Sequence, residues 1–126
     1  MILAVAAQFA WASAQVAPAD RRMTKMELTA TQLAHYMAPG VNLGNTMEAC
    51  DWNDIFTNNA GLKSETSWQN DKTTESYIQS LKKQGFNSLR IPTSWVAGHI
   101  VDKEKMTIDP AWVLRIKEIV DHGLNA

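Results

Sequence analysis

The sequence has little of what disulfide scaffolds, metal sites and nucleic-acid surfaces require. Its 126 residues include one cysteine, Cys50, so neither an internal disulfide nor a multi-thiolate metal site can form. The three histidines are scattered, without HxH or HExxH spacing. Net charge is −1 and no run of like charge occurs, which argues against a nucleic-acid surface or a polybasic membrane patch. We expect no metal, no cofactor, and neither nucleic acid nor membrane as a partner.

Glycine-rich phosphate loops are also missing. The spacing Gly40-x-x-x-Gly44 matches neither GxxxxGK[ST] nor GxGxxG. Tryptophan, in contrast, is plentiful: the chain has five, and four lie between residues 52 and 112. With 45% hydrophobic residues the chain is long enough for one modest core.

The N-terminus carries the longest apolar run. Residues 1–14 end in Ala12-Ser13-Ala14, a small-x-small pattern typical of a signal-peptidase site, although the usual positively charged residue near Met1 is missing. The run is too short to span a bilayer. We therefore expect residues 1–14 to be a signal peptide, clipped or with a misplaced start, and the protein to be secreted. The alternative is an apolar tail without an export role. We expect residues 15–25, which follow, to be a polar linker.

Caps and apolar periodicity predict an alternation of helices and strands. Thr29 and Gln32 make a capping box, Gly85 ends a helix, and Asp109-Pro110 begins one. The loop between the first strand and the second helix has no sustained period, and its tryptophans favour a functional loop over a disordered one. The predicted elements are a helix at 29–37, a strand at 40–45, a loop at 46–71, a helix from Thr73 or Thr74 to 84, a strand at 87–91 and a helix from 109 with Trp112, Val113, Ile116, Ile119 and Val120 on its buried face.

Strands joined by helical crossovers form a parallel α/β sheet whose site lies at the carboxyl ends of the strands. Asn45 ends the first strand, Arg90 and Trp95 flank the end of the second, and the tryptophan-bearing loop leaves the same rim. Indole faces stack on sugar rings, and asparagine and histidine bond their hydroxyls. A rim of this kind suits a neutral carbohydrate better than a phosphate.

Five motifs occur in order and resemble glycoside hydrolase family 5, the cellulases, particularly its broad endo-β-1,4-glucanase branch. The resemblance covers about residues 27–126. The motifs are GVNLGNTMEA (40–49), SETSWQNDKTT (64–74), GFNSLRIPTSW (85–95), GHI (98–100) and IDPAW (108–112).

The resemblance implies the N-terminal part of a (β/α)8 TIM barrel, with residues 26–126 supplying about two βα units of an incomplete barrel that typically needs about 250 residues. The family's retaining mechanism uses two glutamates, one in an Asn-Glu-Pro motif after the fourth strand and one after the seventh. Neither motif occurs here, and the paired histidines after the third strand are absent too. We therefore expect the isolated chain to be inactive, and its uncovered apolar faces to favour self-association.

The family also implies roles for five residues. Arg90 matches the arginine beside the nucleophilic glutamate, whose charge it would stabilise; that partner is missing from this sequence, and the alternative is a surface arginine. Asn45, Trp68, Trp95 and His99 match substrate-binding positions at or near the cleft. Their alternatives are a turn residue, loop packing, the core and a surface histidine with satisfied hydrogen bonds.

Other residues of these motifs have no expected role in the site. Trp112 is expected in the core. Glu48 and Glu65 are not the catalytic pair, because the family places its pair elsewhere and loop carboxylates are usually solvated. The family often has Trp-Gly-Asn-Pro where Trp68-Gln69-Asn70-Asp71 stands, which changes the local turn.

The motifs and their resemblance leave three hypotheses for the function. The first is a piece of a secreted retaining endo-β-1,4-glucanase acting on β-glucan. The second is a non-catalytic carbohydrate-binding or accessory piece. The third is a mannanase or xylanase on the same barrel, since substrate choice depends on other loops.

Overall fold

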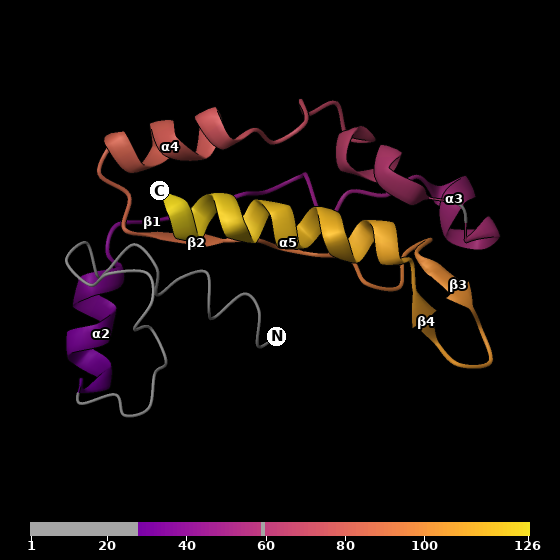
Figure 1. Ribbon diagram of the computed structural model, residues 1–126, viewed down its shortest axis with the longest axis horizontal. Coiled ribbons are helices and arrows are strands. Elements are labelled where there is room, and N and C mark those ends of the chain that lie inside the picture. Colours follow the sequence, from indigo (N-terminus) through magenta and orange to yellow (C-terminus); the bar gives the residue numbers. More distant parts are fainter. Residues whose placement is uncertain (1–27, 59) are drawn as a thin grey trace.

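A computed structural model describes residues 28–58 and 60–126 (Figure 1). The predicted signal peptide and linker, residues 1–14 and 15–25, lie outside this range. The described elements are α2 (Ala30–Met37), β1 (Gly40–Asn42), α3 (Trp52–Thr57), the 3₁₀ helix η3 (Gly61–Thr66), α4 (Glu75–Lys83), β2 (Ser88–Arg90), β3 (Ile100–Asp102), β4 (Thr107–Ile108) and α5 (Pro110–Asn125).

The two strands of the predicted sheet, β1 and β2, are parallel. Val41 lies opposite Leu89 and Asn42 opposite Arg90, and the Leu43 amide extends the pairing by donating to the Arg90 carbonyl at 2.9 Å. Helix α4 leads from the first strand to the second, and α5 follows the second. The strand–helix–strand–helix order is therefore confirmed, although both strands are shorter than predicted.

The predicted helix boundaries follow their caps. Thr29 and Gln32 form both hydrogen bonds of the capping box before α2. The Thr74 hydroxyl caps α4, and Gly85, at φ +96°, ends it in the left-handed conformation that glycine adopts most easily. Asp109 caps α5 through the Ala111 amide, with Pro110 in the first turn.

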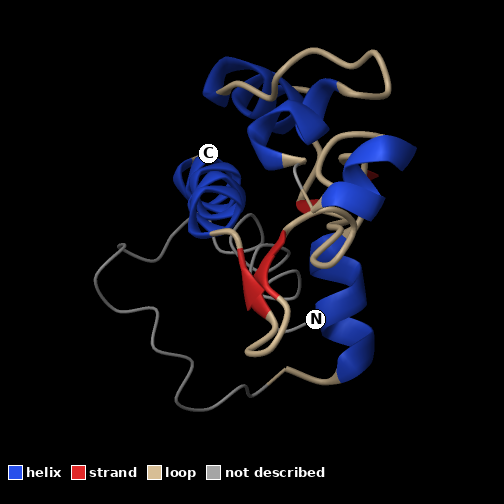
Figure 2. Ribbon diagram, turned by 90° about the vertical axis from the view of Figure 1, so that its right-hand side faces the viewer, coloured by secondary structure: helices blue, strands red, loops and turns tan. Residues whose placement is uncertain are grey.

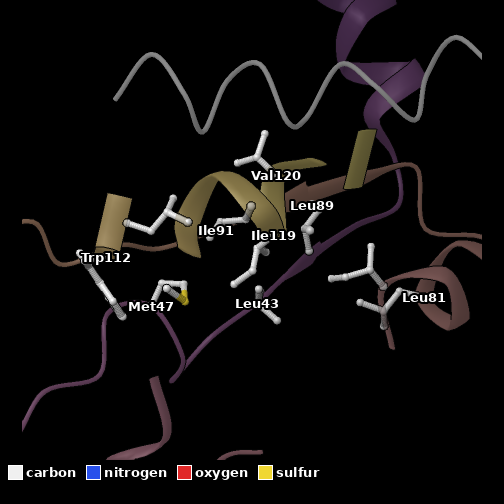
Figure 3. Close-up of a cluster of buried hydrophobic side chains, with 10 residues drawn as sticks. Leu43, Met47, Leu81, Leu89, Ile91, Trp112, Ile119 and Val120 are labelled. Atoms are coloured by element: carbon white, nitrogen blue, oxygen red, sulfur yellow. The ribbon is translucent and has the colours of Figure 1, made fainter. Parts of the chain in front are cut away.

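The core lies between the strand pair and helices α4 and α5 (Figure 3). Trp112 is fully buried, as expected, whereas Val113 is 40% exposed and its predicted place on the buried face of α5 is wrong. Arg115 is buried there instead, at 4% exposure. The buried cluster comprises Leu43, Met47, Ile78, Leu81, Leu89, Ile91, Trp112, Ile116, Ile119 and Val120.

Two parts of the fold differ from the expectation. The stretch predicted as an irregular loop contains α3 and η3, and residues 100–108 form the antiparallel hairpin of β3 and β4. The hairpin and α3 lie at the same end of the molecule, far from α2 (Figure 1), and Figure 2 views the molecule from this end. A hydrogen bond from the Ala60 amide to the Gly98 carbonyl, 3.1 Å, joins the segment after α3 to the segment before β3.

Candidate functional site

The carboxyl ends of β1 and β2 bring Arg90 beside Asn42. The exposed Arg90 guanidinium donates from Nη1 to Asn42 Oδ1 at 2.7 Å, and the two residues are register partners. The partner of Arg90 among the described residues is thus a neutral amide, and the role of Arg90 beside a nucleophilic glutamate stays a prediction. The guanidinium has further N–H donors at the strand ends.

Asn45 lies just beyond β1 in a sharp turn. Its φ is +61°, a left-handed conformation that asparagine tolerates better than most residues. Its amide donates to Glu48 Oε1 at 2.8 Å, and its carbonyl accepts from Asn70 Nδ2 at 2.6 Å. The backbone of Asn45 is therefore held by the turn and by the loop of Trp68, and its exposed side chain lies at the rim.

Trp68 lies in a segment that we call the tryptophan loop, residues 66–72. Its indole Nε1 donates to the Cys50 carbonyl at 2.8 Å, and 46% of the residue is exposed. Gln69, which replaces the family's glycine, has a φ of +67° and so adopts the backbone conformation that glycine would take without strain. The hydrogen bond of its Nε1 thus fixes one edge of Trp68, while the rest of the residue is partly exposed.

A hollow of about 380 Å³ lies beside Trp68. Trp52, the first residue of α3, contributes a second indole that is 76% exposed. Trp52 was not among the predicted site residues, although the tryptophans of its loop favoured a functional segment. The signal for the helix that carries it is Asp51, which caps α3 through the Asn53 amide at 2.8 Å. The lining combines two indoles with carboxylate, amide and hydroxyl groups: Cys50, Asp51, Trp52, Asn53, Ser67 and Trp68.

Trp95 and His99 lie deeper than the rim residues. Trp95 is half-buried and packs against the core. His99 is 1% exposed and stacks on Trp112, with ring centroids 4.0 Å apart and an interplanar angle of 8°. Neither His99 nitrogen has a hydrogen-bond partner among the described residues. The structure therefore places His99 in the interior rather than at the rim or on the surface. Its role in substrate binding stays a prediction.

The burial of His99 gives a pH-dependent stability. Burial lowers the pKa of His99 below its ordinary value of 6.5, although the nearby Asp109 carboxylate opposes this. The unfolded chain then binds a proton at a higher pH than the folded chain, so stability is complete above the unfolded pKa and falls as the pH drops from about 6.5 toward the folded pKa. We expect the urea midpoint to be lower at pH 5 than at pH 8.

The matched variants for this prediction are His99→Phe, which keeps an aromatic ring on Trp112, and His35→Gln, which changes an exposed histidine on α2. The first should flatten the pH dependence between 8 and 5, and the second should leave it unchanged. If His99→Phe lost as much stability between pH 8 and pH 5 as the unsubstituted chain, the assignment of the pH dependence to His99 would be contradicted.

Glu65 is buried, contrary to the expectation of a solvated loop carboxylate. It is 2% exposed and accepts two hydrogen bonds from Arg115, Nε to Oε2 and Nη2 to Oε1, both at 2.8 Å. Burial alone raises the pKa of Glu65, but the bonds from Arg115 and from the Thr73 amide outweigh it, and the pKa lies below 4.5. Glu65 is thus an ionised structural residue.

The other glutamate that was rejected as a catalytic residue, Glu48, is half-buried, and its Oε2 has no hydrogen-bond partner among the described residues.

Within residues 28–58 and 60–126 no group of three or more histidine, cysteine, aspartate or glutamate residues could hold a metal ion. None of the helices in that part of the chain is both long enough and apolar enough to cross a membrane.

The fold and site define part of an α/β glycosidase barrel. The family model of the cellulases, glycosyl hydrolase family 5, matches residues 50–126. The chain is 41% identical over 113 residues to endoglucanase B of Ruminococcus albus, and 36% identical over 125 residues to endoglucanase A of Paenibacillus barcinonensis. These alignments cover 86% and 99% of this chain, and 25% and 28% of the two relatives.

Two solved structures of endoglucanases are also similar to this chain. A GH5-4 broad specificity endoglucanase from Ruminococcus champanellensis with bound cellotriose matches with a TM-score of 0.70 and 35% identity, over 81% of this chain and 29% of that one. A second, from Ruminococcus flavefaciens, matches with a TM-score of 0.67 and 40% identity, over 80% and 27%. The chain belongs to glycosyl hydrolase family 5 and corresponds to the N-terminal portion of its endoglucanases. It spans about a quarter of the length of these relatives.

Proposed function

We propose that this chain supplies one rim of the substrate cleft of a secreted, retaining endo-β-1,4-glucanase and that, by itself, it does not hydrolyse glucan. The observation that carries the proposal is the convergence of Arg90, Asn45 and the tryptophan loop at the carboxyl end of β1 and β2. Neutral polar groups and exposed indoles suit a β-glucan, and a matching structure is described with bound cellotriose.

In the proposed mechanism Arg90 stabilises the ionised nucleophile. A guanidinium favours the charged form of a neighbouring carboxylate and orients it with paired donors. The Asn42 amide would hold the guanidinium at the strand end while its remaining donors face the nucleophile. The acid/base and nucleophilic glutamates are supplied from outside this sequence, since it has no Asn-Glu-Pro motif.

The hollow between Trp52 and Trp68 favours a second function, glucan binding without turnover. Sugar rings stack on exposed indoles, and the amide and carboxylate groups beside them can bond hydroxyls. Binding and turnover are therefore measured separately.

We expect the 126-residue chain to be retarded in a native gel containing β-glucan and to release no reducing ends from carboxymethylcellulose. Trp68→Ala should abolish the retardation, because it removes an indole from the wall of the hollow. Tyr77→Ala is the matched control: Tyr77 is 47% exposed, close to the 46% of Trp68, but lies on α4.

Both the turnover assay and the binding assay have an outcome that would contradict the proposal. Turnover of carboxymethylcellulose by the purified chain would contradict the inactive state. Equal retardation of the wild-type chain and Trp68→Ala would contradict the rim as the binding surface.

A further inference from the structure

Both ends of the tryptophan loop are bound to one guanidinium. Glu65, immediately before the loop, accepts two hydrogen bonds from Arg115 at 2.8 Å. Thr73, immediately after it, accepts a third, from Arg115 Nη2 to its carbonyl at 2.6 Å. The Thr73 amide in turn donates to Glu65 Oε1 at 2.8 Å. We call this set, Glu65, Thr73 and Arg115, the Arg115 clamp.

The clamp is buried and belongs to the rigid part of the fold. Glu65 and Arg115 are 2% and 4% exposed, and Arg115 lies on α5 between the core residues Trp112 and Ile116. The remaining Nη1 donates to Glu118 Oε2 at 2.6 Å, so the guanidinium has acceptors on both sides. A paired, hydrogen-bonded guanidinium has one orientation, which fixes the separation of the two loop ends.

The far side of the same loop contacts the rim. Trp68 donates to the Cys50 carbonyl, and Asn70 donates from Nδ2 to the Asn45 carbonyl at 2.6 Å. The loop therefore connects two structures: α5, through the clamp, and the turn after β1, through Asn70.

We propose that Glu65 and Arg115 are positioning residues for the glucan-binding rim: by fixing both ends of the tryptophan loop to α5, they hold Trp68 and Asn70 against the end of β1. The proposal rests on the proposed function for the identity of the ligand. Neither residue touches the ligand, and their effect is transmitted through the loop. A buried pair that served stability alone would leave the indole of Trp68 unaffected when replaced by apolar residues of similar volume.

The test is an NMR measurement on the full 126-residue chain, with the indole N–H resonances of Trp68 and Trp112 assigned from Trp→Phe variants. The main variant is Glu65→Leu with Arg115→Met, which leaves no buried charge without its partner. We expect the Trp68 resonance to move toward its position in the denatured chain and its exchange with water to rise about tenfold, as for a lost hydrogen bond. The Trp112 resonance, whose indole donates to the Ser94 carbonyl at 2.9 Å, should stay unchanged.

Two further variants sharpen the result. Arg115→Lys keeps a cation beside Glu65 but lacks the fork that reaches Glu65 and Thr73 together, so the Trp68 resonance should move part of the way. Lys117→Met removes an exposed ion pair with Asp121 on the same helix and should move neither resonance. If the double variant fails to fold, Arg115→Lys decides the question.

An unmoved Trp68 resonance in a folded clamp variant would overturn the proposal, and so would equal movement of the Trp112 resonance, which would mean that the clamp holds the whole fold. In the β-glucan gel, the double variant should lose retardation to the extent that Trp68→Ala does. A wild-type chain that is not retarded, with the Trp68 resonance moving as expected, would sink the proposed function and leave the positioning of the loop supported.

Discussion

Trp112→Ala is expected to destabilise the chain by about 3–5 kcal/mol, the range for removing a fully buried tryptophan. Trp112 is 0% exposed, and its indole touches three parts of the fold: the core, the Ser94 carbonyl and the His99 ring. The substitution leaves a cavity, an acceptor without its donor and a buried imidazole without its stacking partner. Because small domains are stable by only about 5–15 kcal/mol, the loss would be a large fraction of the total stability.

The measurement is urea unfolding followed by far-UV circular dichroism. Trp52→Ala is the matched control, since it removes the same group from a position that is 76% exposed and should change stability by less than about 0.5 kcal/mol. Equal effects of the two substitutions would show that the described core is not the core in solution.

Arg115→Met is expected to cost about 3–5 kcal/mol, because it leaves the Glu65 carboxylate buried without its partner. The double variant with Glu65→Leu should be markedly more stable than the single variant, since no charge is then left unpaired. The difference between them in a double-mutant cycle measures the coupling of the pair. Additive effects would contradict a direct ion pair.

The ion pair also has a pH signature. The pKa of Glu65 is lower in the folded chain than its ordinary value of 4.5, so its contribution is present above pH 4.5 and is lost as the pH falls through the folded value. Only the wild-type chain, and not the double variant, should show this loss. It is separate from that of His99, which begins at about pH 6.5.

The sequence predicted those helix boundaries that are set by residues near the ends of the helix. The caps of α2, α4 and α5 rest on side chains within three residues of the helix start, and the glycine after α4 acts through its own backbone. The parallel pairing of β1 and β2 followed from the helix between them. These features required no knowledge of distant contacts.

Short elements without an apolar stripe were missed. Helix α3 has six residues, and its aromatic side chains Trp52 and Phe56 are 76% and 77% exposed, so no helical periodicity points to a core. The β3–β4 hairpin has strands of three and two residues, with a bulge and a left-handed Met106 in its turn. Alternation cannot be recognised over so few positions.

Pairings between distant residues were missed for a different reason. Glu65 and Arg115 are 50 positions apart, and neither residue type is expected in a core unless it has a partner. His99 was predicted at the rim from its motif, but the stacking on Trp112 depends on the path of the hairpin. Resemblance to the family predicted the rim residues, and the structure shows which of them are exposed.

We propose that this chain forms the Arg90-bearing rim of a family 5 cleft. A chimera tests this, in which residues 28–126 replace the part of Ruminococcus albus endoglucanase B that aligns with them, and hydrolysis of carboxymethylcellulose is measured. We predict an active chimera in which Arg90→Ala lowers kcat by about a hundredfold, the scale of one lost electrostatic contact in a transition state. A folded chimera without activity, or one in which Arg90→Ala has no effect, would contradict the account.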